Sequence, residues 1–142
     1  MNVKQALKLK NKLVTELKTC YGILQKYNSI EEGNPRRYSM ANTLAKIDTL
    51  QLELVELKAK IHKANQPVYG RIFELAELKG LVKELKKVPT DEGKQTERYG
   101  SVVSVKEVEL TIVDMEAIVE KFQTKIEEIQ NELDIHNSNT QI

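Results

Sequence analysis

Two histidines and a single cysteine are the side chains of this 142-residue chain that most often perform chemistry. His62 and His136 lie far apart in the sequence and lack the paired spacing of a zinc site such as His-Glu-x-x-His. Each falls in the last turn of a predicted helix, where an imidazole can interact with free carbonyl groups. Cys20 lies on an apolar helical stripe, so we expect it to be a buried, unreactive thiol.

Other motifs that could bind a nucleotide or perform acid–base catalysis are incomplete. Gly93, Lys94 and Gln95 lack both the earlier glycine and the following Ser or Thr of a phosphate-binding loop. The many carboxylates fall on the flanks of predicted helices, where water surrounds them and the burial that tunes a catalytic acid is missing. The sequence therefore predicts that the protein is not an enzyme, with no catalytic, cofactor-binding or metal-binding residues.

Two patterns favour nucleic-acid binding: lysines of the first helix, and arginine beside tyrosine, which can hold a phosphate or stack on a base. The lysines are Lys8, Lys10, Lys12 and Lys18, and the arginine–tyrosine pattern occurs at Arg36, Arg37 and Tyr38 and again at Arg98 and Tyr99. The acidic C-terminal helix opposes the basic field that such a site needs, so we do not expect a nucleic-acid partner.

Charge is distributed unevenly although the net charge is only +1. Residues 1–30 carry six lysines against Glu16, whereas residues 90–142 carry twelve acids against five bases. We expect the two ends to pack together because their charges are complementary. The longest apolar run, residues 117–119, is far too short to span a membrane, and lysines interrupt the first helix where a secretory signal needs an apolar stretch. With one cysteine, these features predict a cytoplasmic protein.

Apolar residues recur every three or four positions along most of the chain, which predicts a single helical domain over residues 1–142. The expected helices cover residues 3–29, 40–64, 69–87 and 112–137. In the last of them, a coiled-coil seam contains Phe122 as its one aromatic residue, which we expect to be buried. The seam residues of the second and fourth helices are Leu44, Ile47, Leu50, Leu54, Leu57, Ile61 and Ala64, and Ile112, Met115, Val119, Phe122, Ile126, Ile129 and Leu133.

One segment, residues 101–110, favours a β-strand because it is rich in β-branched residues. The alternative is an early start of the last helix, with Ser104 as its N-cap and Glu107 as the capping-box acid. A strand needs a partner, which is either the preceding residues 93–100, folded back as a hairpin, or the same strand of another subunit.

Residues spread along the whole chain carry a resemblance to a known family. They are Met1, Val3, Gln5, Ala6, Leu7, Leu9 and Leu13, then Asn28, Ile30, Glu32, Gly33 and Pro35, then Ile61, Lys63 and Asn65, and finally Leu110, Ile112, Met115, Leu133, Asn137 and Thr140. In their order and spacing the chain resembles a small bacterial family of helical proteins sometimes labelled septicolysin, and it departs from that family's ending at Ser138 and Asn139. The resemblance implies a helical bundle with a β element and no established activity.

Together these patterns predict a mainly α protein. It should consist of antiparallel helical hairpins, or a four-helix coiled-coil-like bundle, with a short β element before the last helix. The function that we expect is a non-enzymatic coiled-coil assembly or adaptor protein that forms a homo-oligomer. A second copy of itself is the expected partner, with another protein as a further one. The alternatives are a membrane-active or pore-forming protein, which the family label suggests, and a nucleic-acid-binding accessory protein.

Overall fold

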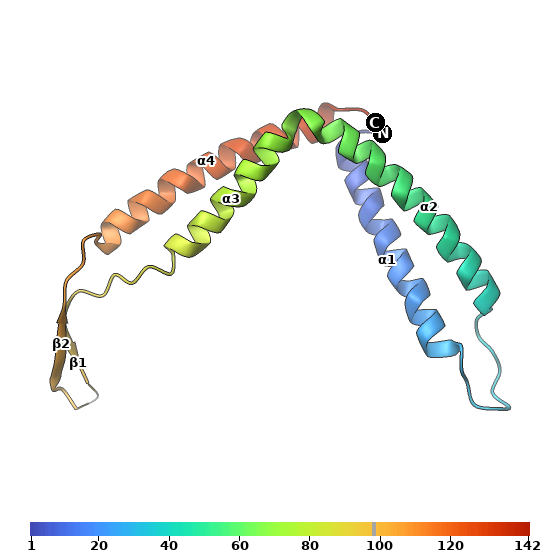
Figure 1. Ribbon diagram of the computed structural model, residues 1–142, viewed down its shortest axis with the longest axis horizontal. Helices are drawn as coiled ribbons and strands as arrows, with labels where there is room; N and C mark the ends of the chain where they lie inside the picture. The colour runs from blue at the N-terminus through green and yellow to red at the C-terminus, as the bar shows by residue number, and fades with distance from the viewer. Residues whose placement is uncertain (98) are drawn as a thin grey trace. The chain divides into compact units, whose positions relative to one another are not determined.

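The protein is mainly helical, and its helices pack as hairpins with a short β-hairpin before the last helix, as the sequence predicts (Figure 1). The computed structural model describes residues 1–97 and 99–142, with the backbone but not the side chains of Val102 and Val103. In chain order the elements are α1 (Val3–Tyr27), α2 (Met40–Asn65), a 3₁₀ turn (Gln66–Val68), α3 (Tyr69–Leu85), β1 (Gly93–Thr96), β2 (Val102–Lys106) and α4 (Ile112–Asn139).

The chain divides into two compact units. The α1–α2 unit contains residues 1–67 and 134–142, and the α3–α4 unit contains residues 68–133. In Figure 1, α1 and α2 lie side by side, and so do α3 and α4. Every helix begins at the residue where the periodicity predicts it, and the ends differ from the predicted ones by two residues or fewer.

A continuous apolar core holds α1 against α2. Apolar residues spaced three and four apart form one apolar face on each helix, and these two faces pack against each other. Leu13 and Leu17 of α1 and Leu50 and Leu57 of α2 each retain only 5–6% of their exposed surface. The buried cluster is Ala6, Leu13, Leu17, Cys20, Ile47, Leu50, Leu57 and Ile61, with Leu7, Leu24, Leu54 and Ile142 packed against it.

The start of the predicted seam in α2 is wrong. Leu44 is 52% exposed, and the neighbouring Thr43 takes the buried position instead. Thr43 can do so because its hydroxyl donates to the carbonyl oxygen of Ser39 at 2.8 Å, so its own polar group is not left unpaired. Ser39 is the N-cap of α2, and its side-chain hydroxyl accepts a hydrogen bond from the backbone N–H of Asn42.

The α1 helix ends at Tyr27, two residues before the predicted end, and an arginine from the following loop caps it. The Arg36 guanidinium donates to the carbonyl oxygens of Tyr27 and Asn28 at 2.9 and 3.0 Å. These carbonyls lack partners within a helix, and a cation at a helix C-terminus also interacts favourably with the helix dipole. The turn itself uses Gly33, whose positive φ of 87° favours glycine.

Both ends of the chain are fixed to each other within the α1–α2 unit, where Figure 1 also places N and C side by side. Asn2 forms a capping box with Gln5, and its side-chain amide donates to the carbonyl oxygen of Ser138. The backbone N–H of Val3 donates to Thr140, and that of Ile142 donates to Met1, each at 3.0 Å. These bonds bring the start of α1 to the end of α4.

Residues 102–106 form a strand rather than an early turn of the last helix. β1 and β2 pair antiparallel, with Gly93 opposite Lys106 and a shift in register between Gln95 and Thr96. The partner is therefore the preceding segment of the same chain, the first of the two predicted possibilities. The strand is shorter than the predicted residues 101–110, because the chain leaves the pairing after Lys106.

The α4 helix begins with a capping box formed by Thr111 and Asp114, seven residues after the alternative pair of Ser104 and Glu107. The Thr111 hydroxyl accepts a hydrogen bond from the N–H of Asp114, and the Asp114 carboxylate accepts one from the N–H of Thr111, at 3.2 and 3.0 Å. This reciprocal pair satisfies two donors at the start of the helix, so the helix begins at Ile112.

The core between α3 and α4 is thinner than the one between α1 and α2. Val82 is the one buried residue of α3, all of which the structure describes. Along α4 the seam is buried at Met115, Ile126, Ile129 and Leu133. Phe122 is half-buried rather than fully buried, and Ile112 is 57% exposed, so the predicted seam is wrong at its first position.

The reason for the exposed start of the α4 seam is the length of its partner helix. Antiparallel pairing places the end of α3, at Leu85, near Met115. Ile112 therefore lies beside the linker that follows α3, and Leu85 and Val88 share its surroundings. An irregular linker covers a side chain less completely than a packed helix does.

Within the described residues, none of the helices combines the length and the apolar composition that a membrane crossing requires.

Candidate functional site

The residues singled out for possible chemistry lie at separate places in the fold. Cys20 is in the α1–α2 core with 3% of its surface exposed, which confirms the predicted burial of the thiol. His62 is exposed on α2. His136 is half-buried, and its Nδ1 lies 3.2 Å from the Thr140 hydroxyl, while its Nε2 is buried without a hydrogen-bond partner. Across residues 1–97 and 99–142, no three His, Cys, Asp or Glu side chains gather in a way that could hold a metal ion.

The predicted arginine–tyrosine clusters are only partly available to a ligand. Arg36 is engaged in capping α1, as described above. Tyr38 is 42% exposed, and the centre of its ring lies 4.9 Å from that of Tyr27 with the ring planes tilted by 48°, so this tyrosine already contacts an aromatic ring within the protein. Tyr99 is 89% exposed, and Arg98 lies outside the described residues.

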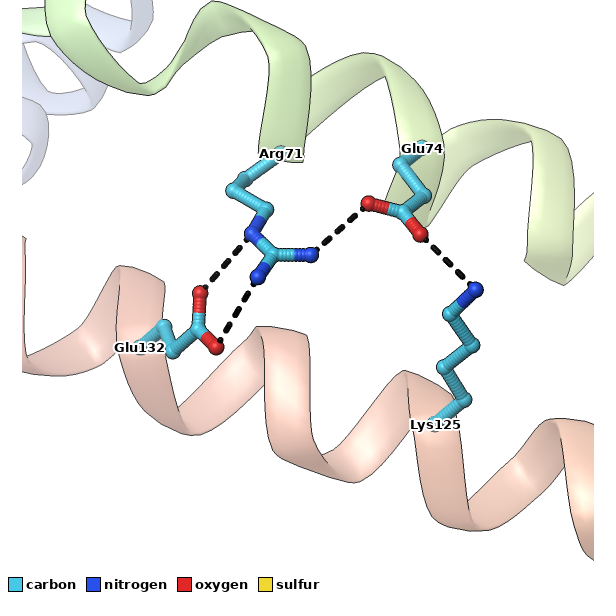
Figure 2. A network of polar contacts seen from close by, with 4 residues as sticks. All are labelled: Arg71, Glu74, Lys125 and Glu132. Carbon is cyan, nitrogen blue, oxygen red and sulfur yellow. Dashed lines mark hydrogen bonds and ion pairs between the residues drawn. The ribbon is translucent and has the colours of Figure 1, made fainter.

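Four charged residues join α3 to α4, as Figure 2 shows. Arg71 Nε lies 2.9 Å from Glu132 Oε2, and Arg71 Nη1 lies 2.9 Å from Glu74 Oε2. The other oxygen of Glu74 is 3.0 Å from Lys125 Nζ. Because residue 71 pairs with 132 and residue 74 with 125, α3 and α4 run antiparallel. The network contains two positive and two negative charges and is neutral as a whole.

The network also shifts the ionisation of its members. The hydrogen bond from Lys125, followed by that from Arg71, lowers the pKa of Glu74 below its ordinary value. The hydrogen bond to Glu74 and the charge of Glu132 raise the pKa of Arg71. The side chains of Arg71 and Glu132 are 46% and 52% exposed and that of Glu74 is 32% exposed, so each of these ion pairs adds little to the stability of the fold.

An open apolar groove lies toward the other end of the α3–α4 unit, next to the β-hairpin. It has a volume of about 500 Å³ and lies between the end of α3, its following linker and the first half of α4. Its apolar lining is Leu85, Val88, Ile112, Met115 and Val119. Ile112 and Val88 are 57% and 44% exposed, so two of the apolar side chains that line this groove are in contact with water.

Opposite charges flank this groove on its two helices. Lys86 lines it from the end of α3, whereas Glu116 and Glu120 line it from α4. None of these three side chains forms an ion pair within the described part of the chain. The groove therefore combines an apolar floor with a basic edge and an acidic edge, an arrangement typical of a surface that another protein covers.

The sequence alone did not identify this surface. The antiparallel register that brings Leu85 and Val88 to Ile112 and Met115 is set by long-range pairs such as Arg71 with Glu132. The charge pattern of the sequence could nevertheless have indicated a charged face on each helix, because the lysines of α3 and the glutamates of α4 repeat at helical spacing.

The basic N-terminus and the end of the last helix meet through backbone hydrogen bonds, whereas the predicted pairing of their charges stays a prediction. The N–H of Val3, in the first turn of α1, donates to the carbonyl oxygen of Thr140, the residue after α4. The carboxylate of Glu132 pairs with α3, through Arg71. Charge on α4 is thus compensated partly by its own hairpin partner.

In comparisons with known proteins, no family model matches the chain, and neither does any curated protein or solved structure. The resemblance to the septicolysin-labelled family stays a prediction from the residues given above.

Proposed function

We propose that the protein is a non-enzymatic assembly or adaptor protein that forms a homo-oligomer through its α3–α4 unit. Protein surfaces that bind other proteins combine an apolar centre with a polar rim. The groove between α3 and α4 combines both kinds of residue, because its apolar lining of Leu85, Val88, Ile112, Met115 and Val119 is joined by the charged Lys86, Glu116 and Glu120.

The observation that carries the proposal is the exposure of apolar side chains around this groove. A helical hairpin turns one apolar stripe of each helix inward, and two helices alone leave the open side of that stripe in contact with water. Val119 and Phe122 belong to the predicted seam and are only half-buried, while Ile112 is mostly exposed. A second copy of the same unit offers the same apolar surface in return.

A molar-mass measurement with paired variants tests this proposal. The parent protein at micromolar concentration should have at least twice the mass of the 16.3 kDa chain. Ile112→Asp should reduce that mass toward the monomer while leaving the helix content unchanged, because Asp is well tolerated in the first turn of a helix. Val55→Asp is the matched control, since Val55 is a β-branched residue of α2 with 66% exposure.

The alternatives have their own readouts in the same samples. Release of a dye from anionic liposomes measures membrane activity, and salt-dependent binding of a single-stranded oligonucleotide measures nucleic-acid binding. A monomeric parent would contradict the proposal. A monomer that is active in either assay would replace it with the corresponding alternative.

A further inference from the structure

We infer that the occupant of the groove is a second copy of this chain, related by a two-fold axis that runs parallel to α3 and α4, so that α3 of each copy lies over α4 of the other. This inference rests on the proposed function and adds the arrangement of the two copies to it. Its basis is the distribution of unpaired charge along the two edges of the groove.

The charge that lines each edge of the groove is repeated along the same face of its helix, beyond the residues that line the groove itself. Lys79 and Lys83 precede Lys86 by seven and three residues, which places all three on one face of α3. On α4, Glu116, Glu120 and Glu127 share a face by the same rule. We call these the lysine stripe (Lys79, Lys83, Lys86) and the glutamate stripe (Glu116, Glu120, Glu127). Within the described residues, none of the six forms an ion pair.

The neighbouring charges do not compete with these stripes. Arg71, Glu74, Lys125 and Glu132 neutralise one another in the network of Figure 2. Lys87 lies 3.1 Å from Glu84, so this pair is also satisfied locally. The charged side chains that line the groove without an ion pair within the described residues are thus basic on α3 (Lys86) and acidic on α4 (Glu116 and Glu120).

The signs of the stripes select one of two ways to stack two identical hairpins face to face. A two-fold axis perpendicular to the helices places α3 over α3 and α4 over α4, which brings like charges together. An axis parallel to the helices places α3 over α4 twice, which brings each lysine stripe to a glutamate stripe. Like charges across an interface are strongly unfavourable, so the parallel axis is the favoured one.

This arrangement also completes the apolar core. The groove floors of both copies, with Met115 and Val119 at their centres, meet at the axis. The four helices then form a bundle in which every neighbouring pair is antiparallel, a common and well-packed arrangement. Both β-hairpins leave this bundle at the same end, because a rotation about the helix direction does not exchange the two ends.

Charge reversal on one stripe at a time tests the inference. The acidic variant carries Lys79→Glu, Lys83→Glu and Lys86→Glu, and the basic variant carries Glu116→Lys, Glu120→Lys and Glu127→Lys. Each variant alone should weaken self-association at least tenfold, as measured by sedimentation equilibrium, because like charges then face each other. An equimolar mixture of the two should form a one-to-one complex, and one chain carrying all six changes should self-associate like the parent.

The control reverses the same number of charges elsewhere. Lys58→Glu, Lys60→Glu and Lys63→Glu lie on exposed positions of α2 and should leave the dissociation constant within about twofold of the parent. The affinity of the parent should also fall as salt rises, whereas that of a purely apolar contact would not.

The outcomes separate this inference from the proposed function. If the parent is monomeric, both fail. If the parent associates but neither single-stripe variant is weakened, or if the mixture does not form the complex, the homo-oligomer stands and the arrangement inferred here is wrong. Recovery of binding in the mixture supports the arrangement, since misfolded variants would not regain it.

Discussion

The two helical hairpins of this protein have similar spacing of apolar residues, but the apolar core of the α1–α2 hairpin is covered more completely than that of the α3–α4 hairpin. Between α1 and α2 a buried cluster runs from Ala6 to Ile61, and Ile142 from the end of the chain packs against it. Between α3 and α4 an exposed ionic network fixes one end, and an apolar groove remains open at the other. The comparison shows that helical periodicity predicts which face of a helix is apolar. Whether that face is buried depends on whether enough helices or other segments of the chain pack against it.

The largest expected effect concerns the core of the α1–α2 unit. Leu17→Ala should lower the free energy of unfolding by about 2–5 kcal/mol, because a Leu with 5% exposure leaves a cavity when it is truncated. The loss should not depend on protein concentration, since this core lies within one chain. Chemical denaturation at two concentrations measures it. Leu52→Ala, at a position with 69% exposure, is the control and should change stability by less than about 0.5 kcal/mol.

Truncation of the aromatic residue in the α4 seam should have a smaller effect of a different kind. Phe122→Ala should cost about 1–3 kcal/mol, below the range for a fully buried Phe, because this side chain is half-buried. If a second copy covers the rest of the ring, the melting temperature of the parent, but not of the variant, should rise with concentration. Identical melting of parent and variant at all concentrations would mean that Phe122 faces solvent in the assembled protein.

Loss of the helix cap at the start of α1 should come next in size. Asn2→Ala removes the side chain that accepts the N–H of Gln5 and donates to Ser138. The expected cost is about 0.5–2 kcal/mol, and it should appear in the α1–α2 unit. Thermal denaturation measures the cost, with Gln25→Ala at an exposed position of α1 as the control. Equal stability of the two variants would show that the cap contributes nothing measurable.

The smallest effect is expected for the network of the α3–α4 unit. The pKa of Glu74 is lowered by Lys125 and Arg71, so its ionised form favours the folded state. That contribution is present above the ordinary pKa of 4.5 and is lost as pH falls through the lowered value. Glu74→Gln should therefore melt slightly below the parent near neutral pH, and the two should converge in acid. Glu77→Gln, which changes an exposed acid of α3 outside the network, should show no such convergence.

The sequence predicts the helices well, because their apolar spacing and their breaks at Pro35 and Pro67 are local properties. It also favours the strand correctly, on the β-branched residues around Val105. Two of its errors lie at the starts of predicted seams. Thr43 replaces Leu44 in the core because a backbone carbonyl satisfies its hydroxyl, and Ile112, at the start of the α4 seam, is 57% exposed because α3 ends before it can cover that position.

The groove between α3 and α4 could not be predicted from the sequence, for a different reason. A groove exists only once the register of α3 against α4 is known, and that register depends on pairs distant in sequence, such as Arg71 with Glu132. The stripes themselves were visible as spacing, but their position on the two edges of one groove was not. Long-range contacts of this kind leave no local pattern in a single sequence.

Hydrogen exchange measured at two protein concentrations tests the central claim most directly. The α1–α2 unit closes its own core, so the protection of its amides should be the same at low and high concentration. The α3–α4 unit is completed by a second copy, so the protection of Val82, Met115 and their neighbours should rise with concentration. Protection that is independent of concentration in both units, while the parent remains monomeric, would contradict the account.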